Sequence, residues 1–325
     1  MTMRMHRVNS ILAACIAALA LAACGPGGPK QDTGAGSSNG NPPTGTTGQG
    51  SSAPALTNNV ATDGRVWINY RRSQIGLPAL TQNPQIDIAA QGHSDYQRVN
   101  DTVTHVQDSS KQGFTGTQLQ DRLEKAGYTI VGTNAIGEVI AASTSGTGFD
   151  LVDQLITAIY HRFVIFEPVF KEIGSGSGVS STKVTYLTAD FAANNGLGPG
   201  IAKGTMVSWP FNGQTGIPTS FASDNEEPDP VPDKGVNTVG YPISVHANLT
   251  STLTVTSFTV HAHGSNASLT TRLLSKATDP NMSTNTSAAA IVPLATLAGN
   301  TTYDVDFTGT LDGAAITKSW SFTTK

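Results

Sequence analysis

The chain has very little cysteine: only Cys15 and Cys24 in 325 residues. Both lie near the N-terminus, so a disulfide that crosslinks the body of the chain is excluded. The folded part must be held by hydrophobic cores alone. Its length leaves room for two domains.

Charged residues are also scarce, at 13%, and no cluster of lysine or arginine stands out in the body. Removing Arg4 and Arg7 leaves 17 basic against 23 acidic residues, a formal charge of −6. A protein that binds the phosphate backbone of nucleic acid needs a basic surface. We therefore expect no nucleic-acid partner, and low charge with abundant Ser, Thr, Gly and Asn is typical of an exported protein.

The apolar run at residues 11–20 is too short to span a bilayer. It follows the basic residues Arg4, His6 and Arg7 and ends in the sequence LAAC, which resembles a bacterial lipobox. We interpret residues 1–23 as a lipoprotein signal peptide, cleaved before a lipidated Cys24. Each buried acyl methylene then adds about 0.8 kcal/mol of membrane binding. The alternative is an ordinary secretory signal with a chance cysteine.

Residues 24–57 contain Gly, Ser, Pro and Thr with almost no large apolar side chains. Such a composition cannot bury enough surface to offset the entropy of ordering, so we predict a flexible tether. Its root-mean-square reach is roughly 30 Å. Gly25 after Cys24, rather than aspartate, favours the outer membrane or cell surface as the location.

Residues 58–196 carry both helical and strand patterns. Asn83 followed by Pro84 predicts a helix start, because asparagine caps helix N-termini and proline suits the first turn. Helices flanking a small antiparallel sheet are expected. The other predicted helices span 60–74, 119–126 and 149–161, and the predicted strands span 128–131, 138–142, 173–178 and 183–191.

Residues 197–236 are rich in proline, with an acidic stretch at 224–227, and are predicted to form a linker. Residues 237–325 show strand signals alone, which predicts a β-sandwich. Asp312-Gly313 predicts a hairpin turn. The predicted strands span 241–245, 253–260, 269–274, 291–294, 303–307 and 319–323.

Three polar residues lie in otherwise apolar surroundings: His105 in TVTHV, Glu138 in AIGEVIAAS, and His161 at the end of the predicted helix 149–161. Two imidazoles and a carboxylate are an accepted zinc ligand set, and zinc with an open position lowers the pKa of bound water to about 7. One hypothesis is therefore a catalytic divalent-metal site. The other is a hydrogen-bonded His–Glu–His network that organises the fold. No HxxxH-type spacing supports the metal hypothesis, because the residues lie on separate segments.

Other polar features are interpreted as structural. Asp121 and Arg122 are expected to form a buried pair, and His93 to lie at a domain surface or cleft edge. His261 and His263 share one face of a predicted strand. We expect them to be an exposed pair rather than metal ligands.

Residues 60–195 carry a series of short motifs whose order and spacing resemble the CAP domain in its bacterial form. CAP is the family of cysteine-rich secretory proteins, antigen 5 and pathogenesis-related 1 proteins. The motifs are Asn69-Tyr70-Arg71-Arg72 with Gly76-Leu77-Pro78; Ala89 to His93; His105; Asp121-Arg122 with Ala126-Gly127-Tyr128; Gly137-Glu138; His161-Arg162 with Ile165; Pro168, Phe170 and Glu172-Ile173-Gly174; and Asp190-Phe191.

This resemblance implies an α-β-α sandwich with a cleft lined by two histidines and two acidic residues. The matching motifs supply His105, Glu138 and His161. The family's second glutamate falls near Ala158, its usual tryptophan is replaced by Leu155, and the asparagine after Glu138 is replaced by Val139. The departures leave a three-ligand site with an open position for water.

The C-terminal residues resemble bacterial immunoglobulin-like or fibronectin-like modules, through LAGNTTYDV at 297–305 and SWSFTT at 319–324. This implies a tyrosine corner in which the Tyr303 hydroxyl bonds to upstream backbone. The predicted fold class is α+β. Its parts are a signal peptide at 1–23, a tether at 24–57, a CAP-type α-β-α sandwich at 58–196, a linker at 197–236 and an all-β immunoglobulin-like sandwich at 237–325.

We expect an exported, lipid-anchored protein of the cell envelope that acts by binding. Its partners would be the membrane, through lipidated Cys24, and a lipid, cell-wall or protein ligand, which the resemblance implies. One alternative is a metal-dependent hydrolase or peptidase that uses His105, Glu138 and His161, with zinc as cofactor. The other is a structural envelope spacer.

Overall fold

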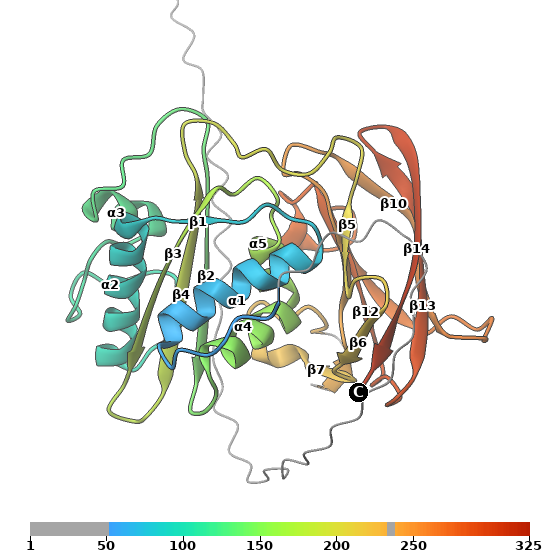
Figure 1. Ribbon diagram of the computed structural model, residues 1–325, viewed down its shortest axis with the longest axis horizontal. Helices are drawn as coiled ribbons and strands as arrows, with labels where there is room; N and C mark the ends of the chain where they lie inside the picture. The colour runs from blue at the N-terminus through green and yellow to red at the C-terminus, as the bar shows by residue number, and fades with distance from the viewer. Residues whose placement is uncertain (1–51, 233–237) are drawn as a thin grey trace, which may run out of the picture.

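The computed structural model describes residues 52–232 and 238–325 (Figure 1). The predicted signal peptide, Cys24 and most of the predicted tether lie outside these residues. None of the described helices is both long and apolar enough to cross a membrane.

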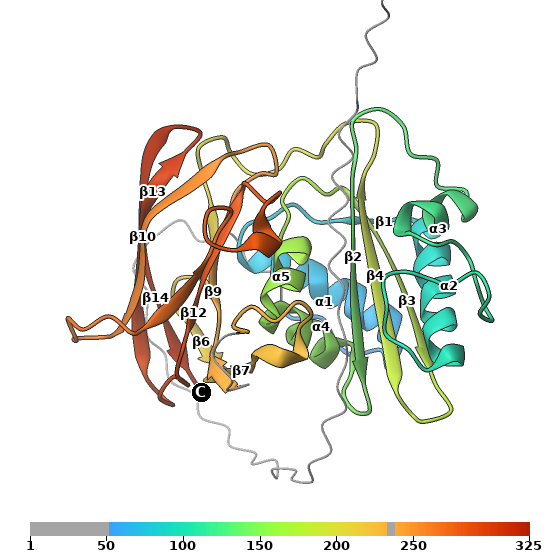
Figure 2. The same cartoon turned by 180° about the vertical axis from the view of Figure 1, so that it is seen from behind.

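The N-terminal half contains a four-stranded sheet between two layers of helices. Strands β2 and β3 each run antiparallel to β4, and β1 pairs parallel to β3, which gives the order β1-β3-β4-β2. Figures 1 and 2 show α2 and α3 on one face of the sheet and α1, α4 and α5 on the other. The elements are α1 (Val60–Gln74), β1 (Thr81–Gln82), α2 (Pro84–Asn100), α3 (Leu119–Lys125), β2 (Ala135–Ser143), α4 (Gly148–Thr157), α5 (Ile159–Ile165), β3 (Glu172–Val179) and β4 (Thr185–Ala193).

Side-chain caps define the helix starts that the sequence predicts. The Asn59 side chain accepts the N–H of Thr62 at the start of α1, and that of Asn83 accepts the N–H groups of Gln85 and Ile86 at the start of α2. Each cap satisfies backbone donors that have no partner within the helix. The predicted helix 60–74 is confirmed with these bounds.

Two predictions in this half are wrong. The predicted helix 149–161 is interrupted at Ala158, whose ψ of 117° ends α4 and begins α5. The predicted strand 128–131 does not form. There the side chain of Asn194 bonds to the N–H of Val131 and the carbonyl of Thr129, where a strand would have ladder partners.

Helix α2 lies directly on the glycines of β3. A Cβ at Gly174 would lie 2.2 Å from the Ile86 carbonyl carbon, and one at Gly176 would lie 2.3 Å from the Gln91 Cα. Polar side chains of α2 then cover the strand: Gln91 accepts the N–H of Ser177 and donates to its carbonyl. This seals an edge that could otherwise pair with another chain.

The C-terminal half consists mainly of two four-stranded sheets, with the orders β10-β13-β14-β6 and β11-β12-β9-β5, beside a small β7–β8 pair (Figure 1). The described strands are β5 (Val207–Trp209), β6 (Gln214–Ile217), β7 (Ser220–Ala222), β8 (Thr238–Gly240), β9 (Ile243–His246), β10 (Leu253–Ala262), β11 (Thr271–Leu274), β12 (Ala288–Pro293), β13 (Thr302–Leu311) and β14 (Ala314–Thr324).

The segment predicted to be a linker, 197–236, is folded over most of its length. Strand β5 pairs with β9, and β6 pairs parallel to β14, so both belong to the C-terminal sheets. Apolar anchors explain this: Trp209 and Ile217 are each 2% exposed, and Trp209 Nε1 donates to the Tyr241 hydroxyl at 2.8 Å. The C-terminal half therefore begins well before residue 237.

Two local predictions in the C-terminal half are confirmed. Asp312 and Gly313 have φ of 53° and 81° between β13 and β14, as a type I′ hairpin turn requires. The backbone N–H of Ala298 donates to the Tyr303 hydroxyl at 2.8 Å, so this tyrosine does contact upstream backbone.

The two halves share one continuous hydrophobic core. It runs from Leu151 of α4 through Phe166 and Trp209 to Val305 of β13, and the rings of Phe166 and Trp209 lie 5.1 Å apart. Arg162, which is fully buried, donates from Nη1 to the Pro242 carbonyl at 2.7 Å. The N-terminal and C-terminal halves are thus packed as one body.

Glu167 lies at this junction. Its Oε1 accepts the N–H groups of Val169 and of Leu249, which belongs to the C-terminal half, each at 3.1 Å. Burial raises the pKa of Glu167 to about 7, although these two N–H groups and the nearby Arg72 oppose the rise.

The glycines of β3 yield a stability prediction. We expect Gly176→Ala to lower the free energy of unfolding by about 1–3 kcal/mol, because the added methyl meets helix backbone that cannot move aside cheaply. Gly92→Ala in α2 is the matched control, since its Cβ would meet only the Thr115 side chain, at 3.1 Å or more. Urea unfolding measures both. Equal losses in the two variants would contradict this account of helix–sheet packing.

The raised pKa of Glu167 predicts a pH dependence. The folded state binds the proton more tightly than the unfolded state, so stability should fall as pH rises from about 4.5 to about 7, by on the order of 2–3 kcal/mol. Glu167→Gln should remove this part of the slope and be the more stable form at pH 8. Urea midpoints at pH 5 and pH 8 test this, with exposed Glu124→Gln as control. An unchanged slope in Glu167→Gln would refute it.

Candidate functional site

Glu138 lies on the edge strand β2 at the centre of a buried polar cluster. Its Oε1 accepts from His105 Nδ1 at 2.7 Å, and its Oε2 accepts from Arg122 Nη2 at 2.6 Å. Arg122 Nη1 also donates to the His105 carbonyl at 3.0 Å. His105 and Glu138 are each 6% exposed and Arg122 is 1% exposed. The structure therefore brings together two of the three predicted site residues, His105 and Glu138.

His93 is the second imidazole beside Glu138. It is fully buried, and its Nε2 lies 3.9 Å from Glu138 Oε2. Burial lowers the pKa of His93 to about 4, more than the Glu138 charge raises it. The neutral ring bonds through Nε2 to the Thr104 carbonyl and through Nδ1 to the Gln107 amide. These partners fix Nε2 as the protonated nitrogen, because a carbonyl only accepts and an amide N–H only donates.

Glu138 stays ionised within the cluster. Burial alone would raise its pKa, but the Arg122 guanidinium, with help from His93 and His105, holds the pKa of Glu138 well below its usual range. Removing this carboxylate would leave Arg122 as a buried charge without a counter-ion.

Asp190 is a member of the cluster that sequence reasoning did not identify as a site residue. It lies opposite Glu138 in the β2–β4 register and is fully buried, and neither carboxyl oxygen has a protein hydrogen-bond partner. Burial, reinforced by the Glu138 charge, raises the pKa of Asp190 well above its ordinary value. Its carboxyl is therefore harder to ionise than that of Glu138. The sequence shows the motif Asp190-Phe191, but it does not show that Asp190 lies opposite Glu138 on the neighbouring strand.

The expected Asp121–Arg122 pair is corrected. Asp121 is exposed, and its side chain accepts the N–H of Gln118 in a capping box at the start of α3. Arg122 turns inward to Glu138 instead. On a helix, side chains of adjacent residues point about 100° apart. The Asp121 and Arg122 side chains therefore do not face each other and do not form a pair.

His161, the third predicted residue, lies in the first turn of α5 and bonds elsewhere. Its Nδ1 is 3.0 Å from Oε1 of Glu226, which is 1% exposed and follows the short 3-10 helix η1 (Ser223–Asn225). Glu226 also accepts the backbone N–H groups of Ile159 and Tyr160, each at 2.7 Å. No hydrogen bond in the described chain joins His161 to His105 or Glu138. The sequence shows Glu226 within the acidic stretch 224–227, but nothing in the sequence indicates that it bonds to α5 and His161.

The described residues do not fit the three-ligand metal site. Each oxygen of Glu138 already accepts a hydrogen bond, one from His105 and one from Arg122, and the third predicted ligand, His161, bonds to Glu226 instead. Within residues 52–232 and 238–325, no group of three or more His, Cys, Asp or Glu side chains is placed to hold a metal ion. We derive no chemistry through zinc.

His261 lies on β10 and His263 in the turn directly after it, both beside Asp304 of β13. His263 Nδ1 bonds to Asp304 Oδ2 at 2.7 Å, and His261 Nε2 is 3.8 Å from the same oxygen. The His263 side chain is 72% exposed and that of His261 only 23%. Both histidines approach the same carboxylate, but only His261 belongs to the strand, and only His263 is exposed as predicted.

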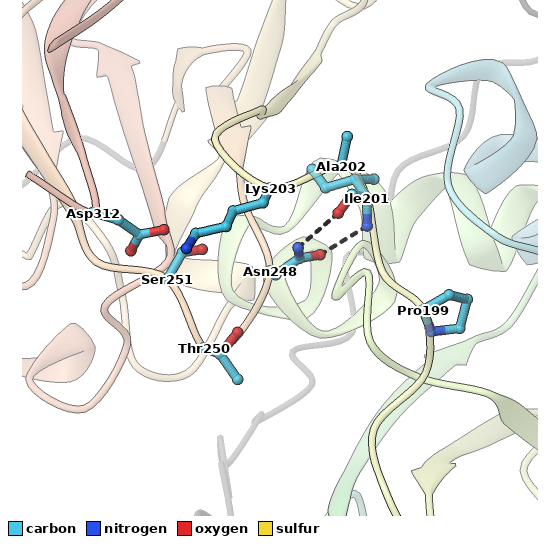
Figure 3. Close-up of a pocket in the computed structure, with 8 residues that line it drawn as sticks. All are labelled: Pro199, Ile201, Ala202, Lys203, Asn248, Thr250, Ser251 and Asp312. Carbon is cyan, nitrogen blue, oxygen red and sulfur yellow. Dashed lines mark hydrogen bonds between the residues drawn. The ribbon is translucent and has the colours of Figure 1, made fainter. Parts of the chain in front are cut away.

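A shallow hollow of about 620 Å³ lies between the segment after β4 and the loops of the C-terminal sheets. Figure 3 shows the Lys203 side chain extending toward Ser251 and Asp312, while the Asn248 amide bonds to both backbone groups of Ile201, at 2.8 Å each. The hollow thus presents opposite charges and hydroxyl groups. Its lining residues are Pro199, Ile201, Ala202, Lys203, Asn248, Thr250, Ser251 and Asp312.

The buried Arg122–Glu138 pair yields a prediction. We expect Arg122→Met to lower the free energy of unfolding by about 3–5 kcal/mol, because an ionised carboxylate loses its buried cation. Arg98→Met is the matched control: Arg98 pairs with Asp95 at 2.6 Å, but both side chains are 40% exposed. Its loss should be about 1 kcal/mol or less. Urea unfolding compares them, and Arg122→Met/Glu138→Gln should recover part of the loss. A mild effect of Arg122→Met would show that the pair is dispensable.

Comparison with known proteins agrees with this geometry in the N-terminal half. Residues 67–191 match the family described as CAP, the cysteine-rich secretory protein family. No curated protein matches the chain.

Three solved structures similar to the chain are of bacterial proteins. They include an outer surface protein from Borrelia burgdorferi, with a TM-score of 0.34, 15% identity and coverage of 40% of this chain and 90% of that one. An extracellular protein containing an SCP domain from Bacillus anthracis str. Ames has a TM-score of 0.34, 24% identity and coverage of 43% and 44%. A cysteine-rich secretory protein from Staphylococcus aureus subsp. aureus Mu50 has a TM-score of 0.29, 18% identity and coverage of 43% and 40%.

The match thus spans less than half of the Bacillus and Staphylococcus chains. The α-β-α layers and the family match lead to one conclusion: residues 67–191 of this protein form a CAP domain.

Proposed function

We propose that this protein acts by binding rather than by catalysis, on the extracytoplasmic side of a bacterial envelope to which lipidated Cys24 anchors it. The LAAC motif after an apolar run and the Gly/Ser/Pro/Thr-rich residues 24–57 support the anchor and tether. The C-terminal half is proposed to be an immunoglobulin-like sandwich, because its two four-stranded sheets contribute to one core.

The observation that carries the proposal is that the polar atoms of the candidate catalytic side chains are hydrogen-bonded or shielded from solvent. Glu138 is bound on both oxygens, and the Nε2 atoms of His105 and His161 are shielded from solvent. A general base must lie within hydrogen-bond reach of its substrate. Here none of the three side chains presents a free atom to solvent for that purpose.

We place ligand binding in the hollow lined by Lys203 and Asp312, which is open to solvent. Peptide-bearing cell-wall fragments carry amino, carboxylate and hydroxyl groups together. Lys203 and Asp312 would pair with the charged groups, and Thr250 and Ser251 would bond to hydroxyls. Exposed charges of this kind give modest affinity and strong salt dependence.

A spacer function is the second candidate, and one observation favours it. The continuous core and the buried Arg162–Pro242 contact make the two halves a single rigid body, as a spacer requires. A spacer would not need the hollow, whereas a binding protein would.

The test uses the mature protein without its lipid. We expect it to sediment with insoluble peptidoglycan, and we expect Lys203→Ala to weaken this binding about three- to tenfold, with exposed Lys276→Ala as the charge-matched control. Lipid vesicles serve as the competing ligand. Binding that is absent, or unaffected by Lys203→Ala, would rule out the hollow as a wall-binding site and favour the spacer.

The hydrolase alternative is tested in the same preparation. Zinc content and hydrolysis of peptide and peptidoglycan substrates are compared between wild type and His105→Ala/His161→Ala. We expect no turnover in either protein. Turnover that wild type supports and the double variant loses would establish catalysis and overturn our proposal.

A further inference from the structure

Glu226 is a residue of the C-terminal half that is buried against α5 of the CAP domain. Its carboxylate receives the backbone N–H groups of Ile159, Tyr160 and His161, at 2.7, 2.7 and 3.2 Å, as well as the His161 imidazole. A carboxylate accepts bonds along several lone-pair directions, so one Glu226 side chain can serve all four donors. The N-cap residue itself, Ala158, has no side chain able to do so.

His161 and His105 are held in the same way. Each ring bonds through Nδ1 to a buried carboxylate, Glu226 for His161 and Glu138 for His105. Each ring also has a buried Nε2 without a hydrogen-bond partner. Because an ionised carboxylate cannot donate, the proton must be on Nδ1, which leaves the Nε2 lone pair free in the neutral ring.

We infer that Glu226 is the positioning residue of His161: it fixes the orientation and the Nδ1–H tautomer of an imidazole that belongs to the CAP domain. The C-terminal half therefore supplies a hydrogen-bond partner to a histidine of the CAP domain. The inference goes beyond the proposed function and does not depend on ligand binding in the hollow at Lys203.

Other contacts hold α5 in place independently of Glu226. The Tyr160 hydroxyl donates to Asp279 Oδ2 at 2.7 Å, and Arg162 donates to the Pro242 carbonyl and to Ser244 Oγ. Ile159, Tyr160 and Phe163 also pack in one apolar cluster with C-terminal residues such as Phe221 and Val231. Loss of the Glu226 carboxylate should consequently leave α5 docked, so the tautomer of His161 can be read in a folded variant.

The test is imidazole ¹⁵N NMR on the ¹⁵N-labelled mature protein, at a pH where the rings are neutral. In wild type we expect His161 and His105 both to be Nδ1–H tautomers. In Glu226→Ala, His161 should lose at least half of its Nδ1–H population, while His105, which keeps Glu138, serves as an internal reference. Glu226→Gln retains an amide oxygen and should restore much of the wild-type signal. Exposed Glu227→Ala is the neighbouring control and should change neither ring.

Two results would overturn the inference. One is an Nε2–H tautomer at His161 in wild type, which needs no variant to observe. The other is a wild-type His161 signal in folded Glu226→Ala. If Glu226 were only a helix cap, its loss would lower stability but would not change the His161 tautomer. Neither readout involves a ligand, so failure of peptidoglycan binding and failure of this inference are separate outcomes.

Discussion

Helix α5 is buried along its whole length, so its polar groups need hydrogen-bond partners within the protein. Much of the structure supplies those partners. Its seven buried residues include His161, Arg162 and the polar end of Tyr160. Buried donors and charges are costly unless they are paired. Because α5 lies between the CAP sheet and the C-terminal sheets, the pairing groups come from both sides, as Figure 2 shows for the position of the helix. Glu226, Asp279 and the Pro242 carbonyl are the C-terminal contribution.

Two buried carboxyl groups, Glu138 and Asp190, and the partly buried Glu167 illustrate how local surroundings set charge. Glu138 remains ionised because Arg122 touches it. Asp190 lies opposite Glu138 on the neighbouring strand, and burial together with the Glu138 charge raises its pKa. Glu167 has only backbone N–H donors and titrates near neutrality. Burial raises the pKa of all three, and only at Glu138 does a guanidinium in direct contact outweigh it.

The features that could be predicted from the sequence were those encoded within a few residues. Asn83-Pro84 marks a helix start and Asp312-Gly313 a hairpin, because caps and turns depend on local backbone geometry. Pairing of His105 with Glu138 was accessible through the family motifs. The break at Ala158 was not, because it depends on Glu226, which lies 68 residues further along the chain and replaces the missing cap.

The predicted linker failed for a related reason. Proline-rich composition indicates irregular backbone, but it does not report on the partner that Trp209 finds in Tyr241 or on the pairing of β6 with β14. Likewise, the motif Asp121-Arg122 suggested a pair, whereas the cluster around Glu138 draws Arg122 inward from a separate helix. Contacts of high sequence separation decide these positions, and a single sequence does not display them.

The continuous core has a consequence for how such a chain can be assembled in evolution. A domain that is exchanged between proteins as a cassette must present a polar surface once its neighbour is gone. Here the outward side of α5 carries Ile159, Tyr160 and Phe163. A descendant that lost residues 197–325 would have to replace these three with polar side chains and supply its own acidic cap near Ala158. Substitutions on α5 are therefore constrained by residues in both halves.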